Sequence, residues 1–371
     1  MSPVLSITIP TYNRVNYLKV MLNSVISEIE RDNLSSKVEI IVSDNCSDDG
    51  TKEYMLSMLD KPYISYSRNE KNIGAIKNII KLATLVKGKY WMFYGDDDSI
   101  YEGSLIKILS AFEENPDIAL FIFKQKGYGK INQDKITTIY NAVSEFFYYM
   151  GNACSSAKTD NIKEHIEKYY DEISSTCWPQ THLMLLAAYA SDNKHPVMIS
   201  TVTVYVAQKK DNNNVIDASY MYYAPFYSLV RLAYLVSNET EDKEFVKHAV
   251  KGIRMMNHYS AIFFALDSTF VYHFLDLPKA QLEFKKLLNE SKSVLKGTHK
   301  YYAYISILIC KIPVTIFKFI YIGLNSFRMS MRGVKISESY AKTMHMIKHG
   351  REEKIALLAR KHTILKNRND W

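Results

Sequence analysis

The sequence YWMFYGDDD occupies residues 90–98 and joins an apolar run directly to three carboxylates. Aromatic side chains such as those of residues 90–94 favour a buried β-strand, so Asp96, Asp97 and Asp98 are expected at its C-terminal end. Adjacent carboxylates repel one another unless a positive charge lies between them, and Mg²⁺ or Mn²⁺ held with substrate phosphate oxygens would supply that charge. The alternative is a solvated turn that caps the next helix, because Asp and Ser are good turn and N-cap residues.

Three earlier segments have the pattern of β-strands that end in polar loops. They cover residues 4–9, 38–42 and 64–66, and a helical pattern follows each loop. Together with residues 90–94 they form four strand–loop–helix units, which predict right-handed crossovers and a mostly parallel sheet. Since parallel strands end at the same edge of a sheet, the four polar loops should converge where open α/β sheets bind ligands.

The polar loops carry four motifs. These are Pro10-Thr11-Tyr12-Asn13-Arg14, SDNCSDDGT at residues 43–51, Asn72-Ile73-Gly74 and Gly95-Asp96-Asp97-Asp98. In this order and spacing the motifs resemble the family 2 glycosyltransferases of the GT-A fold, and the resemblance covers residues 1–210. It implies an α/β catalytic domain with a Rossmann-like, mostly parallel sheet that uses a nucleoside-diphosphate sugar.

The resemblance implies that the loops bind the nucleotide. The corresponding residues of this sequence are Pro10, Tyr12, Arg14, Asp44, Asn72, Gly74 and Asp96. A carboxylate such as Asp44 can accept a hydrogen bond from the N3–H of uracil or thymine, which favours a UDP- or dTDP-linked donor over a CDP-linked one. The alternative for Asp44 is a turn that closes its own loop.

The Asp-x-Asp pattern of the family maps onto Asp96 and Asp98. The resemblance implies that both carboxylates meet the donor diphosphate through Mn²⁺ or Mg²⁺, and that Asp97 hydrogen-bonds the donor sugar. The metal would stabilise the negative charge that builds on the leaving nucleoside diphosphate.

An inverting transfer also needs a base that takes the proton of the acceptor hydroxyl. The family supplies it from a Glu-Asp pair, but the matching positions here hold Pro179-Gln180, and Gln180 cannot act as a base. We expect His182 to take this role, because the N-terminus of a helix opened by Pro179 favours the neutral imidazole that a base requires. A purely hydrogen-bonded His182 is the alternative, and Asp171 and Glu172 are the competing bases.

Residues 178–182 form a Trp-Pro-x-x-His pattern. This pattern resembles the abequosyltransferase-like group, which adds sugars to lipid-linked O-antigen and capsule repeat units. The resemblance therefore implies a glycan acceptor, carried on polyprenyl diphosphate, in the synthesis of a bacterial surface polysaccharide.

Length and composition fit an enzyme with a second module. A chain of 371 residues with 47% hydrophobic residues suggests about two domains with sizeable cores. No secretory signal precedes the first strand, so we expect the catalytic part in the cytoplasm. The four cysteines have no Cys-x-x-Cys spacing, and we expect them to be reduced and without metal.

The character of the chain changes near residue 210. A strand-like segment at 197–207 gives way to a polar loop and then to helical patterns, which predict an all-α module over residues 211–371. Within it, residues 301–327 are apolar but interrupted by charged residues, and no uncharged run reaches the roughly 18 residues of a spanning helix. The polar residues share one stripe, which fits a helix that lies in a membrane interface.

The basic residues are concentrated at the C-terminal end. Residues 296–371 hold 15 Lys and Arg against 4 Asp and Glu, a net charge of +11, whereas the whole chain carries +8. Together with the apolar stripe, this predicts a membrane-associating segment at about residues 300–366 that binds an anionic membrane surface. A soluble helical bundle with a solvated basic face is the alternative. No recognition motif accompanies the charge, so nucleic acid is not expected as a partner.

Taken together, these features predict a metal-dependent, inverting glycosyltransferase that is peripheral on the inner face of the cell membrane. Two alternatives belong to other classes of protein. One is a nucleotide-sugar-binding protein without catalysis, which Gln180 would explain, and the other is a basic helical module that tethers an assembly.

Overall fold

The computed structural model describes most of the N-terminal part of the chain and scattered residues beyond it. The described residues are 2–126, 131–146, 150, 153–160, 162–174, 178–190, 196–207, 242, 244, 245, 247–249, 304, 308, 311–313, 316, 319, 320 and 323. The chain divides into two compact units, Met1–Lys210 and Asp211–Trp371. The predicted all-α module at residues 211–371 lies largely outside the described residues.

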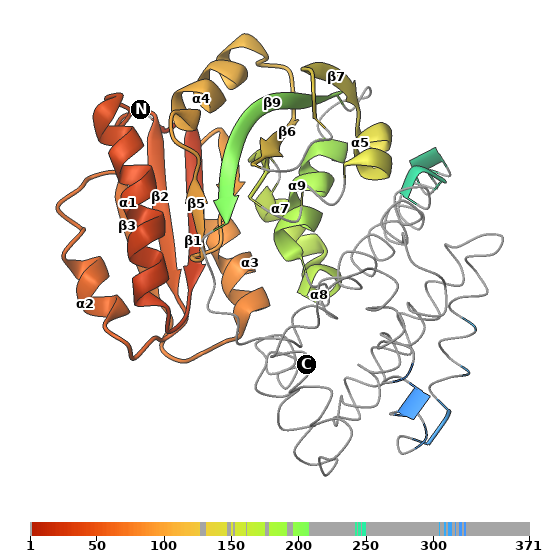
Figure 1. Cartoon of the computed structure of the whole chain (residues 1–371), viewed down its shortest axis with the longest axis horizontal. Helices are drawn as coiled ribbons and strands as arrows, with labels where there is room; N and C mark the ends of the chain where they lie inside the picture. The colour runs from red at the N-terminus through yellow and green to blue at the C-terminus, as the bar shows by residue number, and fades with distance from the viewer. Residues whose placement is uncertain are drawn as a thin grey trace. The chain divides into compact units, whose positions relative to one another are not determined.

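The first unit contains strands and helices that alternate along the chain as far as β4 (Figure 1). Its elements are β1 (Leu5–Thr11), α1 (Val15–Arg31), β2 (Val38–Asp44), α2 (Thr51–Leu56), β3 (Ile64–Arg68), α3 (Ala75–Leu85), β4 (Tyr90–Phe93), β5 (Asp98–Ile100), α4 (Ser104–Glu114), β6 (Leu120–Gln125), β7 (Lys135–Thr138), α5 (Ile139–Glu145), β8 (Ser155–Lys158), α7 (Ile162–Lys168), α8 (Tyr170–Ser174), α9 (Pro179–Ala190) and β9 (Pro196–Ala207). The four strands predicted before residue 95 are confirmed as β1 to β4.

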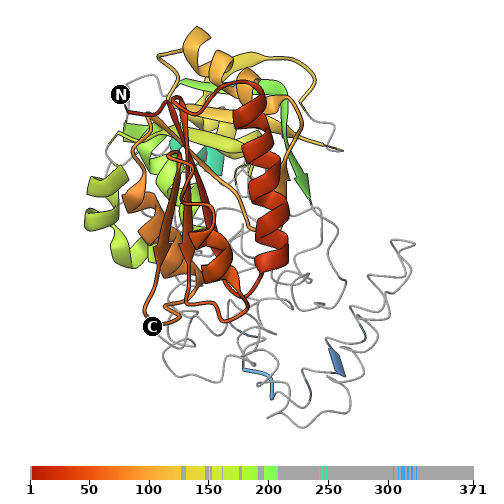
Figure 2. The ribbon, with the colours of Figure 1, turned by 90° about the vertical axis from the view of Figure 1, so that its left-hand side faces the viewer.

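The described strands form one sheet in the order β3-β2-β1-β4-β8-β6-β9-β5, and β7 also pairs with β9. β1 to β4 pair in parallel, as the sequence predicts. β8 enters between β4 and β6 and is antiparallel to both, so the second half of the sheet is mixed. In Figure 2, α1 covers one face of the sheet, and α3, α7 and α9 cover the other.

Aromatic residues of β4 form the centre of the core. Tyr90 and Trp91 are fully buried, and the Tyr90 ring stacks on Phe112 of α4 with 4.0 Å between the ring centroids. The indole N–H of Trp91 donates to the hydroxyl of Thr8 on β1 at 2.7 Å, which satisfies the one polar atom of that side chain. The apolar run before the acidic cluster is thus anchored on both sides, and the strand ends at a fixed place.

A buried carboxylate on α1 fixes the segment that follows the acidic cluster. Glu28 accepts the backbone N–H groups of Gly103 and Leu105 at the start of α4. One turn earlier on α1, the hydroxyl of Ser24 accepts the backbone N–H of Ile100, the last residue of β5. Since β5 is short and, among the described strands, pairs only with β9, these contacts hold its outer edge.

Among the described residues, no helix has the length and apolar character that crossing a membrane requires.

Candidate functional site

The polar loops meet at the C-terminal edge of the parallel strands. Thr11 at the end of β1 pairs with Asp44 at the end of β2, and Asp44 in turn pairs with Arg68 at the end of β3. β4 lies on the other side of β1 and leads into Asp96. The predicted convergence of the four loops is therefore found.

Arg14 supplies the positive charge within the acidic cluster. Its Nη1 atom lies 3.1 Å from Oδ1 of Asp96 and 3.4 Å from Oδ2 of Asp97. The other oxygen of Asp96 accepts a hydrogen bond from the hydroxyl of Thr11 at 2.8 Å. Asp96 is only 4% exposed. The loop after β1 and the loop after β4 are thus joined through Asp96.

Asp98 is held in a tight turn at the start of β5. Its Oδ2 atom accepts the backbone N–H of Gly95 at 2.9 Å, and the residue is 9% exposed. A Cβ atom on Gly95 would lie 2.9 Å from Oδ1 of Asp97 and 3.0 Å from Oδ2 of Asp98, so a side chain at this position would require the two carboxylates to shift. The alternative of a solvated turn that caps a helix is wrong, because Asp98 is buried in a strand and α4 begins at Ser104.

The burial of these carboxylates changes the protonation of groups around them. Burial raises the pKa of Asp96 to about 6, and the charge of Asp97 adds to the rise, whereas Arg14 and Thr11 oppose it. Burial and the neighbouring Asp98 carboxylate, which accepts a hydrogen bond from Tyr205 of β9, raise the pKa of Tyr205. A divalent cation at this edge would favour the ionised form of the carboxylates.

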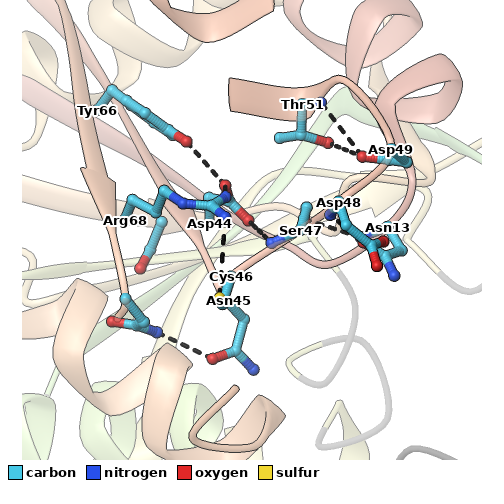
Figure 3. A network of polar contacts seen from close by, with 12 residues as sticks. Asn13, Asp44, Asn45, Cys46, Ser47, Asp48, Asp49, Thr51, Tyr66 and Arg68 are labelled. Carbon is cyan, nitrogen blue, oxygen red and sulfur yellow. Dashed lines mark hydrogen bonds and ion pairs between the residues drawn. The ribbon is translucent and has the colours of Figure 1, made fainter. Parts of the chain in front are cut away.

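Asp44 lies at the centre of a second polar network (Figure 3). It is fully buried, and its Oδ1 atom accepts the backbone N–H of Ser47 at 2.8 Å. Its Oδ2 atom accepts the hydroxyl of Tyr66 at 2.7 Å and also the guanidinium of Arg68. Asp44 therefore does close its own loop through Ser47, and it also forms a buried ion pair with a residue of β3.

Sequence reasoning did not identify Tyr66 and Arg68. They stand two residues apart on β3, the spacing that puts side chains on one face of a strand, and that spacing was the available signal. Burial, followed by the hydrogen bond to Asp44, raises the pKa of Tyr66. The side chain of Arg68 keeps part of its surface exposed, so it can present N–H donors to a ligand.

The loops after β1 and β2 are fastened to each other. The backbone N–H of Asn13 donates to the hydroxyl of Ser47, and the side-chain oxygen of Asn13 accepts the backbone N–H of Asp48, both at 2.9 Å. The backbone N–H of Val15 donates to Asp49 at 2.8 Å. Arg14 stands between two residues whose amides are fixed by the second loop.

Asn72 and Gly74 shape the loop that enters α3. The side-chain oxygen of Asn72 accepts the amide of Asn45 at 2.7 Å and the backbone N–H of Gly74 at 2.9 Å. Gly74 has a φ of 88° and precedes the first residue of α3. Of the other predicted nucleotide contacts, Pro10 and Tyr12 are half-buried.

The predicted bases lie on α8 and α9, which pack against each other. His182 is the fourth residue of α9 and only 2% exposed, and its Nδ1 atom lies 3.4 Å from the carbonyl oxygen of Trp178. Gln180, at the position of the family's carboxylate pair, is also buried. Asp171 is exposed on α8, where Glu172 follows it.

The donor set of the acidic cluster fits a hard cation. Carboxylate oxygens are the ligands that Mg²⁺ and Mn²⁺ prefer. No cluster of three or more His, Cys, Asp or Glu side chains suited to a metal occurs among the described residues. A cation at Asp96 and Asp98 would therefore complete its shell with phosphate oxygens and water, which is how Mg²⁺ is commonly bound with substrates.

A family model described as glycosyl transferase family 2 matches residues 6–173. The chain carries a family 2 glycosyltransferase domain. The resemblance drawn from the four motifs is therefore confirmed. The chain is 37% identical over 127 residues to the abequosyltransferase RfbV of Salmonella typhimurium, a match that covers 33% of the chain and 37% of RfbV.

A longer match joins the chain to the poly(ribitol-phosphate) beta-N-acetylglucosaminyltransferase TarS of Staphylococcus aureus. It is 23% identical over 265 residues and covers 69% of the chain and 44% of TarS. The chain thus spans less than half the length of either curated relative. The crystal structure of TarS 1–349 in complex with UDP-GlcNAc has a TM-score of 0.60 at 17% identity, with 90% of this chain and 95% of that chain covered. At this identity the likeness establishes the shared GT-A fold.

Proposed function

We propose that the protein is a metal-dependent, inverting glycosyltransferase that moves a sugar from a nucleoside-diphosphate sugar to a glycan acceptor. The observation that carries the proposal is the pair of polar clusters at one sheet edge. The acidic cluster (Asp96, Asp97 and Asp98 with Arg14) suits a diphosphate bound through a divalent cation, and the Asp44–Arg68 pair suits a nucleobase. The family 2 domain and the two named transferases support the same activity.

The nucleotide is UDP or dTDP in this proposal. Arg68, whose side chain is partly exposed, offers N–H donors to a base carbonyl oxygen, and Asp44 would accept an N3–H group where the ligand displaces Tyr66 or Arg68 from its Oδ2 atom. Uracil and thymine present both partners, whereas the N3 atom of cytosine carries no hydrogen. The TarS structure with UDP-GlcNAc supports a uridine nucleotide. Pro10 and Tyr12 contact the base and ribose, and Asn72 and Gly74 hold the neighbouring loop.

The metal is Mn²⁺ or Mg²⁺, and Asp96 and Asp98 would hold it. When bound, it stabilises the negative charge on the leaving nucleoside diphosphate. Asp97 hydrogen-bonds the donor sugar and so orients the anomeric carbon. Arg14 adds a second positive charge beside the phosphates.

His182 is the base that accepts the proton of the acceptor hydroxyl. Its place in the first turns of α9 supports this role, because the positive end of the helix dipole favours neutral imidazole. We expect His182→Ala to lower the transfer rate by roughly 10²–10⁴ with donor affinity nearly unchanged. His182→Gln, which fills more of the buried site, controls for packing. Full activity of both variants, with a large loss in Asp171→Asn or Glu172→Gln, would give the role to α8.

The acceptor is a polyprenyl-linked glycan of a bacterial surface polysaccharide, and the protein binds the inner face of the membrane peripherally. The Trp-Pro-x-x-His pattern of residues 178–182 motivates the acceptor class through its resemblance to the abequosyltransferase-like group, and a relative named abequosyltransferase agrees with that resemblance. Exposed apolar side chains support the membrane contact, since Leu308 and Phe319 are each 62% exposed on helical turns. The net charge of +11 over residues 296–371 suits an anionic leaflet.

Donor binding and turnover test the proposal. A thermal-shift screen of nucleotide sugars with Mn²⁺ should find a UDP- or dTDP-sugar that stabilises the protein by mass action. Release of nucleoside diphosphate should then depend on Mn²⁺ and be lost in the Asp96→Asn, Asp98→Asn double variant. Binding without any release, with every acceptor extract tried, would favour a binding protein without catalysis. The absence of both donor binding and nucleoside diphosphate release would favour the basic helical module that tethers an assembly.

A further inference from the structure

One nitrogen atom of Arg14 serves two carboxylates. The Nη1 atom lies within 3.4 Å of a carboxylate oxygen of both Asp96 and Asp97, so one guanidinium faces both negative charges. Both carboxylate side chains are largely buried, whereas the side chain of Arg14 is 44% exposed. The contact therefore joins fixed anions to a cation that reaches them from the solvent side.

The backbone around Arg14 is fixed although its side chain is partly exposed. The Asn13 amide is tied to Ser47 and the Val15 amide to Asp49, on either side of Arg14. Asn13 has a left-handed φ of 52°, which sets the direction of the turn. Arginine has a long side chain with many rotamers. Its head group can exchange partners within reach while its Cα atom stays in place.

A guanidinium and a divalent cation compete for the same carboxylate oxygens. Oδ1 of Asp96 already receives Arg14, and Oδ2 receives the hydroxyl of Thr11. A metal that binds Asp96 must either displace Arg14 from Oδ1 or bind beside a positive charge. Either event weakens the binding of a bare cation. A diphosphate removes the conflict, because its oxygens accept the guanidinium in place of the carboxylate.

We propose that Arg14 is a resident counter-ion that makes metal binding depend on the nucleotide. The inference rests on the proposed function and adds to it a positioning role that the motifs do not assign. When no nucleotide is present, Arg14 keeps the affinity of the acidic cluster for Mn²⁺ low. With the nucleoside diphosphate, the guanidinium transfers from Asp96 to a phosphate oxygen, and the metal takes the released carboxylate. The metal is thereby taken up together with the donor.

The experiment measures three affinities by calorimetry on full-length protein: Mn²⁺ alone, UDP in EDTA, and UDP with saturating Mn²⁺. In Arg14→Met, bare Mn²⁺ should bind about tenfold more tightly, because one nearby positive charge is gone. UDP with saturating Mn²⁺ should bind about tenfold more weakly, because a charge-assisted hydrogen bond is lost, whereas UDP in EDTA should change much less, because Arg14 must leave Asp96 unpaired to reach the phosphate there. The factor by which UDP and Mn²⁺ strengthen each other should fall correspondingly.

Two control variants separate this role from a structural one. Arg31→Met removes a guanidinium from α1 that is 46% exposed and also bridges two carboxylates, Glu28 and Asp32. It should leave all three affinities at the wild-type values. Arg14→Lys keeps the charge and should keep bare Mn²⁺ binding weak.

Unchanged or weaker binding of bare Mn²⁺ in Arg14→Met overturns the inference, as does a failure of both proteins to bind the bare ion. These results leave the proposed function standing as long as wild-type protein binds UDP with Mn²⁺. Failure of wild-type protein to bind any nucleoside diphosphate with Mn²⁺ overturns the proposed function itself.

Discussion

Single carboxylates at the sheet edge serve the fold and the site together. Asp44 illustrates this, because one oxygen closes the β2 loop through Ser47 while the other holds Arg68. A substitution can separate the two roles, because the amide oxygen of asparagine can still accept from Ser47 but carries no charge to pair with Arg68.

We predict that Asp44→Asn and Asp44→Ala differ in a defined way. Asparagine keeps an acceptor for Ser47, so Asp44→Asn should retain more of the free energy of unfolding than Asp44→Ala, which leaves buried donors without a partner and costs about 1–3 kcal/mol. Both variants should bind UDP about tenfold more weakly, because the N3–H acceptor is neutral or missing and Arg68 is no longer oriented. Urea unfolding and calorimetry measure the two effects. Wild-type affinity in Asp44→Asn would reduce Asp44 to a loop-closing residue.

The raised pKa of Asp96 leads to a prediction about how the free energy of unfolding depends on pH. Burial raises its pKa to about 6, so the folded protein holds this proton more tightly than the unfolded chain does. Between about pH 4 and 6 the folded state therefore binds more protons, and the free energy of unfolding falls as the pH rises through this window. Asp96→Asn cannot ionise and should lack this fall, which amounts to roughly 3 kcal/mol.

The measurement is urea unfolding of metal-free protein at a series of pH values from about 4 to 7. The contribution of Asp96 to the free energy of unfolding should be lost by the upper end of this range. Asp48→Asn, on an exposed loop residue, is the matched control and should follow the wild type. Parallel curves for wild type and Asp96→Asn would show that the carboxylate ionises normally. In the proposed site, the same pKa means that Mn²⁺ affinity should rise as the pH passes about 6.

At the level of elements, α1 does more than cover the sheet. Glu28 and Ser24 on its buried face hold β5 and the start of α4, and β5 begins with Asp98. A carboxylate placed at the start of a helix also matches the positive end of the helix dipole. α1 thereby fixes the strand that carries a proposed metal ligand.

We predict that Glu28→Ala destabilises the protein by about 3 kcal/mol, because the N–H groups of Gly103 and Leu105 lose their acceptor inside the protein. Glu28→Gln keeps one acceptor and should cost less. Glu30→Ala changes an exposed carboxylate of the same helix, paired with Lys61, and should have a much smaller effect, because solvent screens this ion pair. Urea unfolding measures all three. Equal effects of Glu28→Ala and Glu30→Ala would contradict the role of Glu28.

The elements that the sequence predicts are those with local signals. β1 to β4 have continuous apolar runs followed by polar loops, and the Asp-x-Asp motif follows the most aromatic of them. The antiparallel insertion of β8 between β4 and β6 has no local signal, because it depends on which edge of the sheet is open when the strand arrives. Arg68 and Glu28 were missed for a related reason. Their partners are 24 residues away for Arg68 and 75 and 77 residues away for Glu28, so only the register of the sheet and the packing of α1 bring them together.

At the level of the whole molecule, the two units differ in charge. Residues 296–371 carry +11, although the chain as a whole carries only +8. Described helical residues of this segment also expose apolar side chains, namely Tyr304, Leu308, Ile316, Phe319 and Ile320. Charge and apolar surface together are what an amphipathic interfacial segment needs.

We predict that the protein binds vesicles containing anionic lipid, that neutral vesicles bind it less, and that added salt weakens the binding because the electrostatic part is screened. The double variant Leu308→Glu, Phe319→Glu should lose most of the binding, since it places charge on the apolar side chains that enter the interface. Val20→Glu is the matched control, because Val20 is also about half exposed but lies on α1 of the first unit. Co-sedimentation measures binding of the protein to the vesicles.

Activity of the double variant on a lipid-linked acceptor should fall together with vesicle binding, while its hydrolysis of the donor in solution should not change. Equal co-sedimentation of the double variant and the wild type would leave the basic segment as a solvated or partner-binding face.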